Sequence, residues 1–164
     1  MRDNPVRYRM AIAVLALVAG LVATYLHLWK IGAVGPLSCT GGGGCMVAQM
    51  SQYGWFPTPD IPFLGRPGWR GVDVALIGAV GYGLLTALAA IGTLPRFAHR
   101  RGVTTLMLAG IVAAVLFTWR LKYGEWVALR VFCIWCFESF VTIHLCLLLA
   151  LLDRRRLARE AAPA

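Results

Sequence analysis

Long apolar runs separated by short polar or turn-rich segments dominate the chain. Crossing the hydrocarbon core of a bilayer takes about 20 helical residues. Four runs reach or approach that length: residues 10–28, 72–94, 103–119 and 131–152. A segment exposed to lipid has to satisfy its backbone hydrogen bonds internally, so each run is predicted to be a helix. The pattern therefore predicts one membrane domain over residues 1–164, an all-α, polytopic four-helix bundle.

The longest segment outside these spans is the loop of residues 29–71. Apolar residues recur at helical spacing from Met46 to Tyr53, which predicts a short amphipathic helix on the bundle or in the membrane interface. The prolines and glycines that follow, up to Gly68, exclude a long helix. Apolar residues interleave with them, which is unusual for a solvated linker. This second half is predicted to be a lid over the outer mouth of the helices.

Composition and charge agree with a membrane protein and argue against a nucleic-acid partner. The chain is 59% hydrophobic and 14% charged, which is too apolar for a soluble domain of this size. The formal net charge is +9, but the basic residues cluster at span ends and leave no soluble domain to carry a binding face.

The distribution of basic residues also predicts an orientation. Ten Lys and Arg residues lie on the side that holds both termini and six on the other. By the positive-inside rule, both termini are expected in the cytoplasm and the long loop outside the cytoplasmic (inner) membrane. The basic start and the small residues Ala33 to Gly35 leave cleavage of a signal peptide as an alternative, although the apolar run is long for one.

Two pairs of cysteines lie on the predicted outer side. Cys133 and Cys136 form a C-x-x-C motif at the start of the fourth span, and Cys39 and Cys45 lie in the long loop. The first turn of a helix stabilises an anion, so the Cys133 thiol is predicted to have a lowered pKa. Each residue turns a helix by about 100°, so Cys133 and Cys136 share a face and their sulfurs can bond to each other.

Each pair has an alternative interpretation. Cys133 and Cys136 could be reduced core residues, and Cys39 and Cys45 could form a static structural disulfide. The four could also bind zinc, although a C-x5-C pair beside lipid is not a usual zinc knuckle, and no metal site is predicted. Two pairs on one side of the membrane favour a relay, in which Cys45 reaches the membrane dithiol while Cys39 meets an outside protein.

Two other residues of the fourth span draw attention. Phe140 lies one turn beyond Cys136, where it could stack on a flat ring or serve only for packing. Cys146 lies about 15 Å deeper than Cys136 and is predicted to be a packing residue.

The order of these features resembles the vitamin K epoxide reductase family in its bacterial form. The resemblance covers nearly the whole chain and rests on four spans, the two cysteine motifs, a serine six residues after Cys45 (Ser51) and the turn-like segment Pro62-Phe63-Leu64-Gly65. Bacterial disulfide bond formation protein B also has four spans and two cysteine pairs. Its motifs occur in the opposite order, so it is the weaker match.

The resemblance implies a membrane thiol-quinone oxidoreductase. Cys39 would exchange with a thioredoxin-fold, DsbA-like partner on a separate chain, and Cys45 would exchange with Cys133. Cys136 would then react with a quinone of the menaquinone, ubiquinone or vitamin K type. Such an enzyme would support disulfide bond formation outside the cytoplasm.

Two residues are implied only as cofactor contacts. Ser51 would support a quinone oxygen or the geometry of the loop. Phe140 occupies the position where the family often has a tyrosine. The alternative from another functional class is a non-catalytic membrane protein that holds zinc or a partner through its cysteines.

Overall fold

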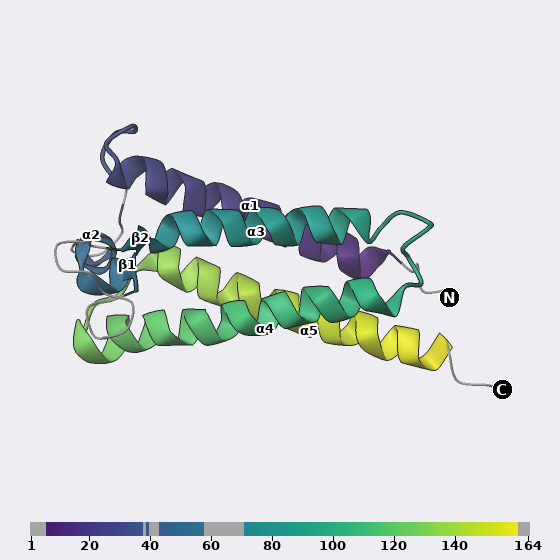
Figure 1. The fold of residues 1–164 in the computed structure, drawn as a ribbon. Helices are drawn as coiled ribbons and strands as arrows, with labels where there is room; N and C mark the ends of the chain where they lie inside the picture. The colour runs from purple at the N-terminus through teal and green to yellow at the C-terminus, as the bar shows by residue number, and fades with distance from the viewer. Residues whose placement is uncertain (1–5, 38, 40–42, 58–70, 161–164) are drawn as a thin grey trace.

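In the computed structural model, four long helices lie side by side, and short elements gather at one end of them (Figure 1). The structure describes residues 6–37, 39, 43–57 and 71–160. The long helices are α1 (Arg7–Lys30), α3 (Val74–Ile91), α4 (Arg101–Tyr123) and α5 (Ile134–Glu160). All four are long and apolar enough to cross a membrane. The prediction of an all-α membrane bundle with four spans is confirmed.

Short elements cover the end of the bundle that carries the loop between α1 and α3, named the outer end, and the opposite end is named the inner end. They are α2 (Gly44–Met50), the 3-10 helix η1 (Gln52–Gly54), the strands β1 (Trp55–Phe56) and β2 (Val72–Asp73), and the π-helical turn η2 (Gly124–Ala128). The two strands pair antiparallel, with Trp55 opposite Asp73 and Phe56 opposite Val72. Residues 58–70 of the predicted lid, including Pro62-Phe63-Leu64-Gly65, lie outside the described residues.

Helix boundaries differ from the predicted spans, most in the third and fourth of them. The third span is longer than residues 103–119, because α4 begins at Arg101 and continues through η2 to Ala128. The fourth helix begins at Ile134 rather than at residue 131 and continues to Glu160. In both extensions charged side chains are buried in ion pairs, Lys122 with Glu125 and Asp153 with Arg156, so they do not end the helix.

Small residues allow α1 and α3 to pack closely. Ala16, Ala19 and Ala23 are buried on α1, and a side chain at Gly20 would lie 3.3 Å from the β-carbon of Tyr82. Close backbone approach through small residues is how helices associate in a membrane, where lipid supplies no hydrophobic driving force between them. The α1 and α3 pair therefore forms one side of the bundle.

A buried ionic cluster ties together the inner ends of the helices. The fully buried Arg9 of α1 donates to Asp153 of α5 at 2.9 Å, to the carbonyl of Gly92 at 2.6 Å and to Thr104 of α4 at 2.9 Å. Asp153 also accepts a hydrogen bond from Thr104 at 2.6 Å. A buried guanidinium needs this many partners, because an unpaired one costs several kcal/mol.

At the outer end, Asp73 fastens the loop to the bundle. It caps α3 by accepting from the Ala75 backbone at 3.0 Å, and it contacts His27 and Lys30 of α1 at 2.7 and 2.5 Å. Lys30 also donates to the Gly54 carbonyl at 3.0 Å. These contacts fix the position of η1, and through it α2, above the helices.

Candidate active site

The structure brings all four predicted redox cysteines into one cluster at the outer end. Cys45 and Cys133 are almost fully buried in one cluster. Cys39 and Cys136 are partly buried and pack against it. All five cysteines of the chain are unpaired thiols, so the structure represents the reduced form. The loop pair and the C-x-x-C pair therefore meet, as a relay requires.

Gly44, the first residue of α2, allows this meeting. A β-carbon at this position would lie only 2.5 Å from the carbonyl oxygen of Phe132, one residue before Cys133. Any side chain there would push the start of α2 away from the start of α5. The absence of a side chain at Gly44 thus lets the next residue, Cys45, lie against Cys133.

The start of α5 is capped from two directions. The Cys136 amide donates to the sulfur of Cys133 at 3.4 Å, so the Cys133 thiol caps the first turn. The backbone amide of Cys133 donates to the Glu125 carboxylate of η2 at 2.7 Å. Amides at a helix start have no partner inside the helix, and these two contacts satisfy two of them.

Glu125 is itself held by a buried ion pair. Its second oxygen accepts from the Lys122 ammonium at 2.7 Å, and both side chains are almost fully buried. The ammonium lies 5.1 Å from the ring centre of Trp126 and 5.9 Å from that of Phe132. This pair fixes the backbone of Cys133 relative to α4.

The Cys133 thiol does not have the lowered pKa that the sequence predicts. Its hydrogen bond with Cys136 and its burial raise the pKa of Cys133, and the nearby carboxylate of Glu125 adds to the effect. The favourable effect of the helix start is outweighed because the Cys133 sulfur is buried and hydrogen-bonded with the neighbouring thiol. In the reduced form Cys133 is therefore held as a protonated thiol.

Partial burial and a hydrogen bond with Cys45 raise the pKa of Cys39 from 9.0 to about 11. The thiolate is the species that attacks a disulfide, so Cys39 in the reduced form is a poor nucleophile at neutral pH.

We expect alkylation of Cys39 to report this pKa. At pH 7 the thiolate fraction is about a hundredfold below that of a thiol with the ordinary pKa, because the shift is about two units. The rate should rise about tenfold per pH unit and level off near pH 11. Iodoacetamide labelling of the reduced protein with peptide mass spectrometry measures this.

The Cys45→Ser variant is the control for that measurement. It removes the Cys45 thiol, which contributes to the raised pKa of Cys39, while the burial of Cys39 remains. The pH profile of the Cys39 alkylation rate should therefore move to lower pH. A Cys39 rate that levels off near pH 9 in the unaltered protein would contradict the prediction.

The amphipathic helix predicted after the glycines is present, but its apolar stripe points outward. Met46, Val47 and Met50 are about half exposed, at 53%, 49% and 54%. The face toward the bundle carries Cys45, Ala48 and Gln49. Of the two predicted locations, this exposure favours the membrane interface for the apolar stripe.

A large apolar cavity lies directly below the cysteine cluster. It has a volume of about 710 Å³ and is lined by all four long helices together with Gln49 of α2. Cys136 is on its wall. Cavities of this size and polarity are typical sites for small organic ligands. Cys136 thus belongs both to the thiol cluster and to the cavity.

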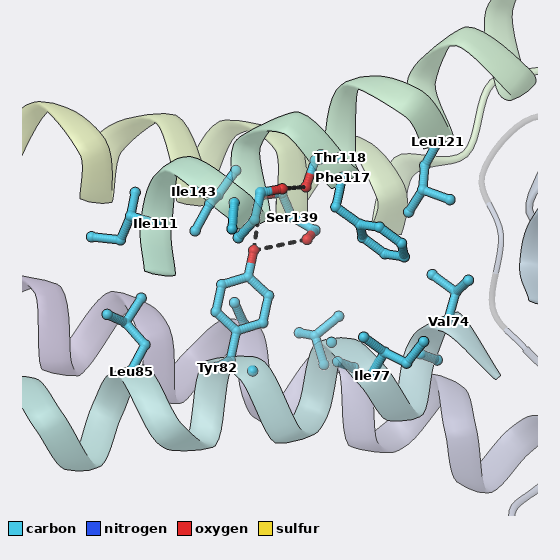
Figure 2. A pocket seen from close by; sticks show the side chains of 18 of the residues that line it. Val74, Ile77, Tyr82, Leu85, Ile111, Phe117, Thr118, Leu121, Ser139 and Ile143 are labelled. Carbon is cyan, nitrogen blue, oxygen red and sulfur yellow. Dashed lines mark hydrogen bonds between the residues drawn. The ribbon is translucent and has the colours of Figure 1, made fainter. Parts of the chain in front are cut away.

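A few polar side chains lie on the otherwise apolar wall of this cavity, near Cys136. Gln49 donates to the Cys136 sulfur at 3.6 Å. Tyr82 extends from α3 toward Ser139 of α5, as Figure 2 shows, and its hydroxyl lies 2.8 Å from the Ser139 hydroxyl and 3.1 Å from the Ser139 carbonyl. Ser139 is one turn below Cys136, about 4.5 Å along the axis.

The cavity opens between α3 and α4. Lining residues on these two helices are solvent-exposed in the isolated protein, among them Gly81, Leu84, Leu106 and Gly110. In a membrane this opening faces the lipid tails. A ligand with a long apolar chain can therefore keep the chain in lipid while its ring occupies the cavity.

The two residues predicted to contact a quinone lie elsewhere. Ser51 follows α2 and donates to the Ala48 carbonyl at 2.8 Å. Phe140 packs between Trp119 and Trp126, with ring centres at 5.2 and 6.1 Å. Neither is on the cavity wall. Their contact with a quinone stays a prediction, and the geometry favours packing for Phe140. Cys146 is fully buried in the core, as predicted.

Several residues of the site have only a weak signal in the sequence. Gln49 lies four residues after Cys45, which places it on the same helical face. Glu125 is an isolated acid eight residues before Cys133, and Tyr82 is a single aromatic in an apolar helix. The sequence positions of Glu125 and Tyr82 do not indicate a role in the site unless the tertiary fold is known.

The helical membrane bundle and its clustered thiols define a membrane thiol oxidoreductase. The chain matches the model of the vitamin K epoxide reductase family over residues 10–151, and it belongs to that family. It is therefore a thiol-quinone oxidoreductase of the vitamin K epoxide reductase type. Members generally use a quinone as electron acceptor and usually work with a thioredoxin-like partner. A search of curated proteins found no match to the chain.

Proposed function

We propose that the protein oxidises the dithiol of a separate thioredoxin-fold protein outside the cytoplasm and passes the electron pair to a membrane quinone. The observation that carries this proposal is the position of Cys136, which lies in the thiol cluster and on the wall of the apolar cavity. The half-buried Cys39 is the more accessible thiol of the loop pair, so it is the one to meet the partner.

The exchange proceeds in balanced steps. The partner dithiol reduces a Cys39–Cys45 disulfide and becomes a disulfide itself. Cys45 then attacks the sulfur of Cys133 in a Cys133–Cys136 disulfide, and Cys136 leaves as the thiolate beside the cavity. Cys39 attacks Cys45 to close the loop disulfide. The Cys133–Cys136 pair is now a dithiol and holds the two electrons.

The quinone ring would lie in the cavity with its apolar chain between α3 and α4. Gln49 and the Tyr82–Ser139 pair place polar groups on the cavity wall beside Cys136 and one helical turn further along α5. The Cys133–Cys136 dithiol closes to a disulfide as the quinone takes up two electrons and two protons.

The basic residues support an orientation with both termini in the cytoplasm of a bacterial inner membrane. Arg96, Arg100, Arg154 and Arg155 are exposed, between α3 and α4 or near the end of α5, at the end opposite the cysteines. The positive-inside rule assigns this end to the cytoplasm. The site then faces the compartment in which disulfides persist.

The test is stoichiometric electron transfer in purified protein in lipid nanodiscs under anaerobic conditions. We expect a reduced thioredoxin-fold protein and a short-chain naphthoquinone to give one quinol for each partner disulfide formed. Protein with its thiols alkylated should give none, and the Cys146→Ala variant should match the unaltered protein. Stoichiometric zinc without quinol formation would instead favour a non-catalytic binding protein.

A further inference from the structure

Glu138 is a carboxyl group on the wall of the apolar cavity, two residues after Cys136. Acidic residues in membrane helices are costly and are retained mainly at functional sites. One oxygen of Glu138 accepts from Thr142 at 2.9 Å. The other oxygen is buried and has no hydrogen-bond partner among the residues that the structure describes.

The other polar groups of the cavity wall are already engaged. Tyr82 is bound to Ser139, Lys122 to Glu125, and Thr118 to a backbone carbonyl of its own helix at 2.7 Å. Gln49 donates to Cys136. Among the described residues of the cavity wall, Glu138 is the acid whose buried carboxyl oxygen has no hydrogen-bond partner, so this oxygen is available to a ligand.

Reduction of a quinone needs protons as well as electrons in this dry cavity. We propose that Glu138 is a catalytic acid that delivers one of these protons to a quinone oxygen. This inference rests on the proposed function and names a further residue of the same site. Positioned acids and bases contribute typically 10²–10⁴-fold to such transfers.

The step balances without any other reactant. Protonated Glu138 gives its proton to one quinone oxygen as the electron pair arrives from the Cys133–Cys136 dithiol. The dithiol releases two protons when it becomes a disulfide. One goes to the second quinone oxygen, and the other restores the Glu138 carboxyl. The sum is quinone plus dithiol to quinol plus disulfide.

Glu138 lies close to the dithiol that restores its proton. It is four residues beyond the start of α5, about 6 Å along the helix axis, and two residues after Cys136. The position therefore suits an acid that is reset in each cycle by a proton from the dithiol.

The test uses single-turnover quinol formation by the full-length protein in nanodiscs, starting from the dithiol form and a short-chain naphthoquinone. We expect Glu138→Gln to slow this step at least about a hundredfold. Quinone affinity, measured by quenching of tryptophan fluorescence, should stay within about threefold of the unaltered protein. Glu160→Gln, an exposed acid at the far end of α5, is the matched control and should leave the rate unchanged.

A chemical rescue separates proton delivery from a structural role. Adding acetic acid to Glu138→Ala should restore quinol formation in proportion to its concentration, because the small acid can occupy the vacated space. Glu138→Asp should be faster than Glu138→Gln, since it keeps an acid at a longer distance. The comparison of Asp with Gln variants is made on protein with an unchanged unfolding midpoint.

Three results would overturn the inference. The first is an unaltered rate in Glu138→Gln. The second is a slow Glu138→Ala variant that acetic acid does not rescue. The third is a Glu138→Asp variant no faster than Glu138→Gln. Absence of quinol formation in the unaltered protein would instead remove the proposed function, and this inference with it.

Discussion

Replacing Cys136 by alanine is expected to abolish quinol formation, with a loss of at least about a thousandfold in rate. Cys136 is the thiol that lies on the cavity wall, and the other three redox cysteines are behind it in the cluster. Without its sulfur no disulfide can close next to the quinone. Stopped-flow absorbance of the quinol under anaerobic conditions measures the loss.

Cys146→Ala is the matched control for this prediction. It removes a thiol from the same helix at a buried site in the core, away from the cavity wall. Its rate should stay within about twofold of the unaltered protein, as expected for a cysteine with no part in the exchange. Equal quinol formation in the Cys136→Ala and Cys146→Ala variants would exclude the assigned path.

Cys45→Ser should block electrons that come from a protein dithiol but not those from a small one. Cys45 is the loop cysteine buried beside Cys133, so the partner loses its route to the C-x-x-C pair. The rate with a reduced thioredoxin-fold protein is expected to fall by at least about a thousandfold. A small dithiol that reaches the Cys133–Cys136 disulfide directly should still support quinol formation. Both rates are measured in the same preparation.

This contrast decides between a relay and a structural disulfide. If Cys39 and Cys45 only stabilised the loop, Cys45→Ser would lower stability and leave the two electron sources equally affected. Unchanged transfer from the protein dithiol would exclude the relay.

The four membrane spans and the class of thiol oxidoreductase could be predicted from the sequence because both depend on local features. A run of apolar residues predicts a span without knowledge of its neighbours. Similarly, two pairs of cysteines on one side of the membrane, at the start of one helix and in a glycine-rich loop, favour redox exchange over a structural role. Even α2 was predictable, since its periodicity is visible between Met46 and Tyr53.

The contacts that tune the site could not be predicted, because they come from segments that meet only in the fold. The Glu125 carboxylate caps α5 from the end of α4, and Tyr82 reaches Ser139 from α3. Helical periodicity gave Phe140 the same approximate face as Cys136. Helical periodicity does not show which part of a helix face lines the cavity. In the structure Phe140 packs against Trp119 of α4 and is not on the cavity wall.

The start of α5 shows how tertiary contacts also change the chemistry. A helix start by itself predicts a lowered pKa for Cys133. The buried hydrogen bond with Cys136 reverses that effect in the reduced form. Whether a thiol at a helix start is ionised therefore depends on its partner as much as on the helix.

The ionic cluster around Arg9 has a consequence for motion during turnover. It joins α1, α4 and α5 at the end of the bundle opposite the cysteines through buried contacts that are costly to break. Widening of the bundle to admit a quinone is therefore expected to hinge at this end and to be largest near the thiols. The helices would separate most at the end that carries the cysteines. Entry of the substrate and rearrangement of the loop cysteines would then occur in the same motion.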